Sequence, residues 1–197
     1  NALQIENGSF ETGDFTGWVA APLNGSVATG SSIEGFTATD GAYFAALSAD
    51  ASLRSRAQTW IAGDQLSFDW NFISGESLQE WSMRFNDYSL FTVFDVNGDE
   101  LDSVRLADIA GIVSGAVSEG WNRFTYSFDA NGAGWFEFGV FNLGSSANDS
   151  MLLIDNVVAP NGAEVETPAT PVPEPGTLAL FALGLAGLGL TRRLAAR

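Results

Sequence analysis

The sequence contains no cysteine, no histidine and no lysine, and all eight of its basic residues are arginines. Without cysteine, the chain forms no disulfide and offers no thiolate to a metal. Without histidine, it cannot build a Ser-His-Asp or Cys-His catalytic system, or a histidine-ligated zinc site. Without lysine, it has neither a Schiff-base amine nor a Walker-type phosphate loop. Because these absences remove the commonest catalytic systems, we expect a protein that is not an enzyme.

Positive charge is also scarce in most of the chain. Residues 1–171 hold 23 acidic residues against five arginines, and such a surface repels nucleic acid and anionic lipid. We therefore expect no nucleic-acid partner. Carboxylate oxygens are the ligands that Ca²⁺ prefers, although solubility alone also explains an acidic surface.

Residues 1–160 show the pattern of strands and no helix of core size. Leu66, Phe68, Trp70 and Phe72 alternate with polar residues, which is typical of a strand with one buried face. Asn97-Gly98 is a hairpin signal between two further strand candidates. With roughly eight to twelve short strands separated by turn signals, residues 1–160 are predicted to form an all-β, antiparallel jelly-roll sandwich.

The chain after the sandwich reads as a spacer and a membrane anchor. Residues 161–174 are rich in proline and predict an extended linker. Residues 175–197 hold the uncharged run Leu178 to Leu190, followed by Arg192 and Arg193 as a membrane stop. A helix there reaches the short end of what a bilayer requires, and the arginines predict a cytoplasmic C-terminus. We expect a single-pass protein whose sandwich faces the periplasm or cell surface, with its export signal already removed.

One short motif links this tail to a known signal. Val172, Pro173, Glu174 and Pro175, followed by the apolar run and the terminal arginines, resemble the PEP-CTERM sorting signal of exported bacterial proteins. The resemblance implies recognition by a membrane-embedded exosortase. That enzyme would cut near the motif and release the protein or anchor it again at the surface.

A second resemblance concerns both ends of the sandwich. The stretch from Asn7 to Trp18, N-G-S-F-E-T-G-D-F-T-G-W, and the closing Ile154-Asp155-Asn156-Val157 resemble carbohydrate-binding-module-like jelly rolls. The resemblance implies a structural Ca²⁺ bound by Glu11 and Asp155, with Asn7 and Glu6 as further ligands. Carboxylates that cap turns or face water are the alternative.

For a carbohydrate, we expect aromatic side chains that stack on pyranose rings. The three tryptophans that the strand pattern ties least clearly to the core are Trp60, Trp81 and Trp121. A large aromatic residue in a sandwich is more often part of the core, and that alternative stays open. Asp87, Asn142 and Asp149 form a further candidate polar cluster, which turn formation explains equally well.

Together these features predict a surface or extracellular-matrix protein that interacts with polysaccharide. The alternative is an accessory or structural subunit of a membrane complex whose tail stays uncut. Small residues such as Ala182, Gly184 and Ala186 would allow another helix to approach the tail closely.

Overall fold

The computed structural model describes residues 3–22, 26–48, 50–75, 86–112, 118–143 and 149–160. The chain divides into two units, Asn1–Thr167 and Pro168–Arg197, and all of the described residues belong to the first. The expected linker 161–174 and tail 175–197 lie outside the described residues, together with the sorting motif and the membrane stop. Within the described ranges, no helix has both the length and the apolar character needed to cross a membrane.

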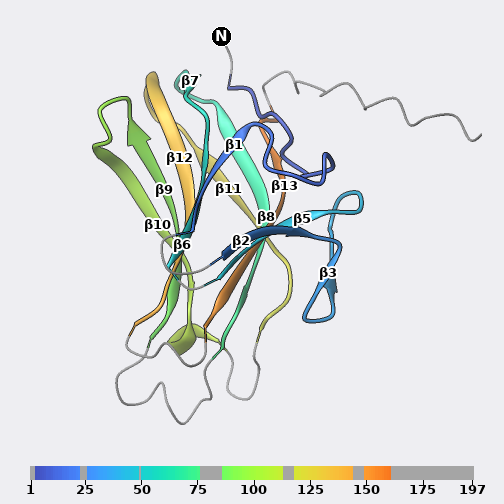
Figure 1. The fold of residues 1–197 in the computed structure, drawn as a ribbon. Helices are drawn as coiled ribbons and strands as arrows, with labels where there is room; N and C mark the ends of the chain where they lie inside the picture. Colours follow the sequence, from blue (N-terminus) through green and yellow to red (C-terminus); the bar gives the residue numbers. More distant parts are fainter. Residues whose placement is uncertain are drawn as a thin grey trace, which may run out of the picture. The chain divides into compact units, whose positions relative to one another are not determined.

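Two antiparallel sheets lie face to face (Figure 1). The first sheet has the order β1-β6-β12-β9-β10, and β7 also pairs with β12. The second sheet has the order β11-β8-β13-β5-β2. This arrangement confirms the predicted antiparallel β-sandwich.

The strands of the first sheet are β1 (Trp18–Pro22), β6 (Ala51–Ser55), β7 (Gln58–Trp60), β9 (Tyr88–Asp95), β10 (Glu100–Asp108) and β12 (Gly132–Phe141). Those of the second sheet are β2 (Ser26–Gly30), β5 (Phe44–Ser48), β8 (Gln65–Ile73), β11 (Asn122–Ser127) and β13 (Met151–Val158). A small hairpin pairs β3 (Ser32–Ile33) with β4 (Phe36–Thr37), and one short 3-10 helix, η1 (Ile109–Gly111), follows β10.

The core between the sheets is rich in phenylalanine. Phe68 of β8 lies 4.8 Å from Phe138 of β12 and 5.2 Å from Phe91 of β9, measured between ring centroids. All three side chains are fully buried, and burial of each contributes about 1.5 to 3 kcal/mol. The alternation in residues 66–72 is confirmed, because Leu66, Phe68 and Phe72 belong to this core.

The outer faces of the two sheets differ. On the second sheet, Phe44, Ala46, Ile73 and Leu153 form a separate hydrophobic cluster that the β3–β4 hairpin covers with Ile33 and Phe36. Figure 1 shows this hairpin beside β5, away from the first sheet. The two hydrophobic clusters of the described residues provide no comparable cover for the outer face of the first sheet.

The opening turn of the chain lies against the last strand. The backbone N–H of Val157 donates to the carbonyl oxygen of Gly8 at 3.0 Å. A Cβ at Gly8 would lie 1.9 Å from the carbonyl oxygen of Val157, so only glycine allows this approach. The start of the sandwich and β13 are therefore neighbours, as the jelly-roll resemblance implied.

Candidate functional site

The outer face of the first sheet carries two pairs of stacked aromatic rings. Phe136, Phe138 and Val140 of β12 point into the core, so the residues between them point outward. Across the neighbouring strands, Trp135 stacks on Phe94 with 5.7 Å between ring centroids, and Phe141 stacks on Tyr88 at 5.0 Å. All four rings are partly exposed. We call the outer surface of the first sheet that carries these four rings, from Trp135 and Phe94 to Phe141 and Tyr88, the aromatic face.

Each aromatic pair is extended by an arginine. The guanidinium carbon of Arg54 lies 5.2 Å from the centre of the Trp135 ring, and that of Arg105 lies 4.4 Å from the centre of the Tyr88 ring. Because β6 and β9 pair with opposite edges of β12, Arg54 and Phe94 lie on opposite sides of Trp135. A cation held against a ring in this way contributes about 0.5 to 1 kcal/mol at an exposed site. The arginines therefore hold the rings in place on the sheet.

Polar side chains lie between the two aromatic pairs. Glu137 is opposite Arg54 on β6 and Thr92 on β9, and the Thr92 hydroxyl lies 3.1 Å from that of Ser103 on β10. Burial raises the pKa of Glu137, against the opposing effects of a hydrogen bond from Ser52 and the charge of Arg54. Between this polar row and the pair of Tyr88 with Phe141, the same face carries Leu90 opposite Gly139.

The dimensions of the aromatic face suit an extended ligand. Trp135 and Phe141 are six residues apart on one strand, which corresponds to about 20 Å at the usual rise per residue. A ligand that spans both ring pairs must therefore be a chain of several units rather than one small molecule.

Two of the three tryptophans predicted to bind sugar lie away from the aromatic face. Trp60 is only 4% exposed and stacks on Phe128 with 4.8 Å between centroids, so its ring faces are enclosed by the core. Trp121 donates its Nε1–H to the carbonyl oxygen of Thr37 and meets Phe44 edge-on, within the cluster on the second sheet. Trp81 lies outside the described residues. The structure does not bring Trp60 and Trp121 together, and it encloses Trp60 in the core rather than on a binding surface.

The aromatic face itself carried a signal in the sequence. The stretch Trp135-Phe136-Glu137-Phe138 has two phenylalanines on one face of the strand and a tryptophan and a glutamate on the other. If the phenylalanines face the core, Trp135 must face outward. That sequence pattern identifies an outward tryptophan, although it does not show which neighbours stack on it.

Two of the residues predicted to bind calcium hold one loop. One Glu11 oxygen, Oε1, accepts the backbone N–H groups of Ala42 and Tyr43, both at 2.8 Å. Asp155 Oδ2 accepts those of Thr39 at 2.6 Å and Asp40 at 3.0 Å. The two carboxylates therefore fix the backbone of residues 39–43 from two sides.

The other two predicted ligands belong to the opening turn. The side-chain amide of Asn7 donates to the carbonyl oxygens of Asp14 and Thr16, and Glu6 is partly buried beside Gly17. In the part of the chain that the structure describes, no three acidic side chains form a group suited to a metal ion. Burial raises the pKa of Asp155, although four hydrogen bonds to its carboxylate oppose the rise. A bound calcium ion stays a prediction.

The third predicted cluster ties two loops together. Asp87 accepts the backbone N–H of Leu143 at 2.8 Å and the hydroxyl of Ser150 at 2.7 Å. The side-chain amide of Asn142 donates to Asp149 at 3.1 Å. Asp87 is fully buried, so it serves as an internal anchor for these loops.

Comparison with known proteins identifies the tail motif and the fold. Residues 171–193 match the family model described as the PEP-CTERM protein-sorting motif. The search of curated proteins found no relative of this chain. Among solved structures, the chain is similar to the K1 cleaved adhesin domain of Lys-gingipain from Porphyromonas gingivalis W83, with 14% identity over 79% of this chain and 96% of that one and a TM-score of 0.51. It is also similar to TmCBM61 in complex with beta-1,4-galactotriose, with 19% identity over 81% of this chain and 99% of that one and a TM-score of 0.49.

A third similar structure, "Family 16 Carbohydrate Binding Module-2", has 17% identity over 79% of this chain and 97% of that one, with a TM-score of 0.43. Identities this low show the fold alone. The chain is thus an antiparallel β-sandwich with carbohydrate-binding modules among its structural neighbours, and it carries the PEP-CTERM protein-sorting motif at residues 171–193.

Proposed function

We propose that this protein is an exported bacterial surface protein that an exosortase processes, and that its sandwich binds a polysaccharide chain through the aromatic face. The sorting motif at residues 171–193 supports export and processing. The observation that carries the binding proposal is the pair of partly exposed stacks, Trp135 with Phe94 and Tyr88 with Phe141, on the outer face of the first sheet.

The chemistry of the face fits a carbohydrate. The C–H faces of pyranose rings pack on aromatic rings, while hydroxyls require donors and acceptors beside them. Ser103 and Glu137, which are both partly exposed, provide such groups, and the buried Thr92 supports Ser103 through its hydroxyl. Arg54, whose guanidinium carbon lies 5.2 Å from the centre of the Trp135 ring, adds an exposed group of N–H donors beside that ring. A chain of several sugars, rather than a single one, covers the length from Trp135 to Phe141.

Trp135→Ala tests the binding site. Binding of soluble β-1,4-galactan, xylan and a β-glucan is measured by isothermal titration with the full chain. For whichever polymer binds, Trp135→Ala should weaken binding at least about 30-fold, because a central aromatic anchor typically contributes about 2 kcal/mol or more. The matched control is Trp121→Ala, a partly exposed tryptophan on the other sheet.

Circular dichroism confirms that both variants keep the sandwich. Equal binding by wild type and Trp135→Ala would refute the aromatic face as the site. Weaker binding by Trp121→Ala alone would move the site to the second sheet.

Processing at the tail has its own test. Intact mass of the native protein should show truncation near Glu174, and replacement of Pro173, Glu174 and Pro175 by alanine should leave the full-length chain. A wild-type chain that keeps its tail and co-purifies with one membrane assembly would instead support an accessory subunit of that assembly.

A further inference from the structure

The two ring pairs of the aromatic face are related by an approximate two-fold axis. The axis passes between β9 and β12, which are neighbouring antiparallel strands of the first sheet (Figure 1), at the point where Phe91 lies opposite Phe138. We call these two residues the centres of β9 and β12. Trp135 lies three residues before the centre of β12, and Tyr88 lies three residues before the centre of β9. Because the strands run in opposite directions, these equal offsets fall at opposite ends of the face.

The second ring of each pair follows the same symmetry. Phe94 lies three residues after the centre of β9, and Phe141 lies three residues after the centre of β12. The axis therefore exchanges the stack of Trp135 on Phe94 with the stack of Tyr88 on Phe141. The two stacks have similar dimensions, with 5.7 Å and 5.0 Å between ring centroids.

The arginines of the face also correspond. Arg54 on β6 is opposite Glu137, one residue before the centre of β12. Arg105 on β10 is opposite Leu90, one residue before the centre of β9. Their guanidinium carbons lie 5.2 Å and 4.4 Å from the centre of the ring in their own half. Each half of the face thus presents an arginine, a ring and a second ring in the same order across three strands.

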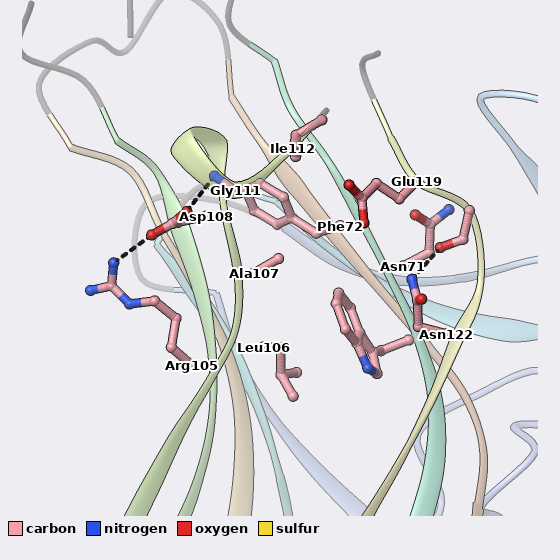
Figure 2. Close-up of a pocket in the computed structure, with 12 residues that line it drawn as sticks. Asn71, Phe72, Arg105, Leu106, Ala107, Asp108, Gly111, Ile112, Glu119 and Asn122 are labelled. Carbon is pink, nitrogen blue, oxygen red and sulfur yellow. Dashed lines mark hydrogen bonds and ion pairs between the residues drawn. The ribbon is translucent and has the colours of Figure 1, made fainter. Parts of the chain in front are cut away.

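Each arginine has an acidic side chain close by. Figure 2 shows the ion pair between Arg105 and Asp108, which has a length of 3.0 Å. In the other half, Glu137 is opposite Arg54. The two acids occupy different positions relative to the axis, so the symmetry is approximate, but neither half has an arginine without an acid beside it.

The halves differ most beside the centre of the face. Thr92 and Glu137 lie opposite each other in the half that contains Trp135, whereas Leu90 and Gly139 lie opposite each other in the other half. Every unit of a polysaccharide carries hydroxyl groups, so a chain that runs in either direction can offer a hydroxyl to Glu137. This difference therefore does not select one direction of the chain by itself.

We propose that the aromatic face binds the interior of a polysaccharide chain in either of its two directions. The inference rests on the proposed function, because it concerns how the same face holds its ligand. A polysaccharide chain has two different ends, and selection of one direction requires a difference in binding free energy between the two directions. Turning the chain end for end on this face exchanges two similar stacks, so both directions bind with similar strength. A stretch inside a chain suits such a face, because recognition of a chain end requires one direction.

Oligosaccharides with a paramagnetic label at one end test the direction. Oligosaccharides of β-1,4-galactan, xylan and a β-glucan, each long enough to span both ring pairs, receive a nitroxide either at the reducing end or at the non-reducing end. The full chain is titrated with each, and line broadening is followed by NMR at the indole N–H of Trp135 and at the ring of Tyr88. Trp135→Phe and Tyr88→Phe identify the two signals.

The expected result is that both labels give a similar pattern of broadening. The ratio of broadening at Trp135 to that at Tyr88 should change by less than about 10-fold when the label moves to the other end, which is about the effect of one hydrogen bond made in one direction only. If the chain binds in one direction, the ratio reverses when the label moves. A change larger than this limit would overturn the proposal.

Paired substitutions test whether the two halves are equivalent. Arg54→Gln and Arg105→Gln should each weaken binding of the unlabelled polymer by about 2- to 5-fold, the usual effect of a cation held against an exposed ring. Arg123→Gln is the matched control, because it removes the same charge from the second sheet, where Arg123 pairs with Asp69. This control should bind as the wild type does. A loss of binding in only one of the two aromatic-face variants would show that the halves differ and would also overturn the proposal.

The outcome is separable from that of polysaccharide binding itself. Binding that Trp135→Ala weakens, combined with a broadening ratio that reverses, refutes the two directions and leaves the aromatic face as the site. Binding that Trp135→Ala leaves unchanged refutes the aromatic face and this inference with it, and so does an absence of binding with all three polymers.

Discussion

Replacing Asp155 by asparagine tests how the sandwich holds the loop at residues 39–43. The Asp155 side chain is fully buried on β13. Its Oδ2 accepts the backbone N–H groups of Thr39 and Asp40, and its Oδ1 accepts that of Asn156 at 2.7 Å. Asparagine has nearly the same shape but only one acceptor oxygen, because its second terminal atom is an N–H₂ donor.

The expected loss follows from this change of one acceptor into a donor. In the more favourable of its two orientations, the amide oxygen still accepts the N–H groups of Thr39 and Asp40. The N–H₂ group then faces the N–H of Asn156, and neither group can accept the other's hydrogen. One buried donor then has no acceptor, which costs about 1 to 3 kcal/mol. Removal of a carboxylate whose pKa is raised by burial offsets part of that cost. For Asp155→Ala, three N–H groups lose their acceptor, and the loss should be at least about 3 kcal/mol.

Urea unfolding at pH 7, followed by tryptophan fluorescence, measures the effect. With a denaturant slope of about 1 to 3 kcal/mol per molar urea, Asp155→Asn should lower the unfolding midpoint by roughly 1 M. Asp129→Asn, at an exposed position after β11, makes the same change in net charge and should leave the midpoint in place. Equal midpoints for the two variants would refute the idea that Asp155 holds the loop.

The same proteins test the predicted calcium ion. If Asp155 binds Ca²⁺, a chelator should lower the melting temperature of the wild type and not that of Asp155→Asn, because a ligand present at 100 times its dissociation constant stabilises by about 2.7 kcal/mol. An unchanged wild-type melting temperature would remove the calcium hypothesis and leave Asp155 with hydrogen bonding alone.

Three further predictions concern stability. Burial raises the pKa of Glu137 above 4.5, so the folded protein binds this proton more tightly than the unfolded chain does, and the stability from this group is present below about pH 4.5 and is lost as pH rises through the folded pKa. Glu137→Gln should therefore be more stable than the wild type at pH 7, measured by thermal unfolding. A stability difference that persists at pH 3.5 would contradict this reasoning. Gly8→Ala should lower the free energy of unfolding by at least about 1 to 3 kcal/mol, since its Cβ would lie 1.9 Å from the backbone oxygen of Val157. An unfolding midpoint in urea equal to that of the wild type would show that Gly8 and Val157 do not approach this closely. Trp60→Ala should cost about 3 to 5 kcal/mol in the same assay because it removes a core ring stacked on Phe128, whereas a loss below about 1 kcal/mol would indicate an exposed ring.

Patterns within single segments predicted much of the fold. The alternation at residues 66–72 identified one buried face of β8, and Asn97-Gly98 marked the turn between β9 and β10 correctly. The opening and closing stretches were expected to be neighbours, and Gly8 and Val157 do hydrogen bond. These features depend on residues close in sequence, whose side-chain directions the strand geometry sets.

The candidate site was harder to predict because it depends on long-range pairing. Trp60 and Trp135 both lie in strands flanked by glycine and polar residues, yet one ring is enclosed by Phe128 and the other is partly exposed. Period-two alternation separates the two faces of a strand, but it does not tell which face another element will cover. Within the described ranges, the β3–β4 hairpin covers the outer face of the second sheet, and no comparable hydrophobic cluster lies on that of the first.

The sequence by itself determined which chemistries are absent, which segments form strands and which sorting motif the chain carries, because each of these is a property of composition or of contiguous residues. Only the tertiary structure decided that Glu11 and Asp155 hold one loop, that Arg54, Trp135 and Phe94 stack across three strands, and that Asp87 anchors Leu143 and Ser150. These arrangements join residues from different strands, and strand order and register alone bring such residues into contact.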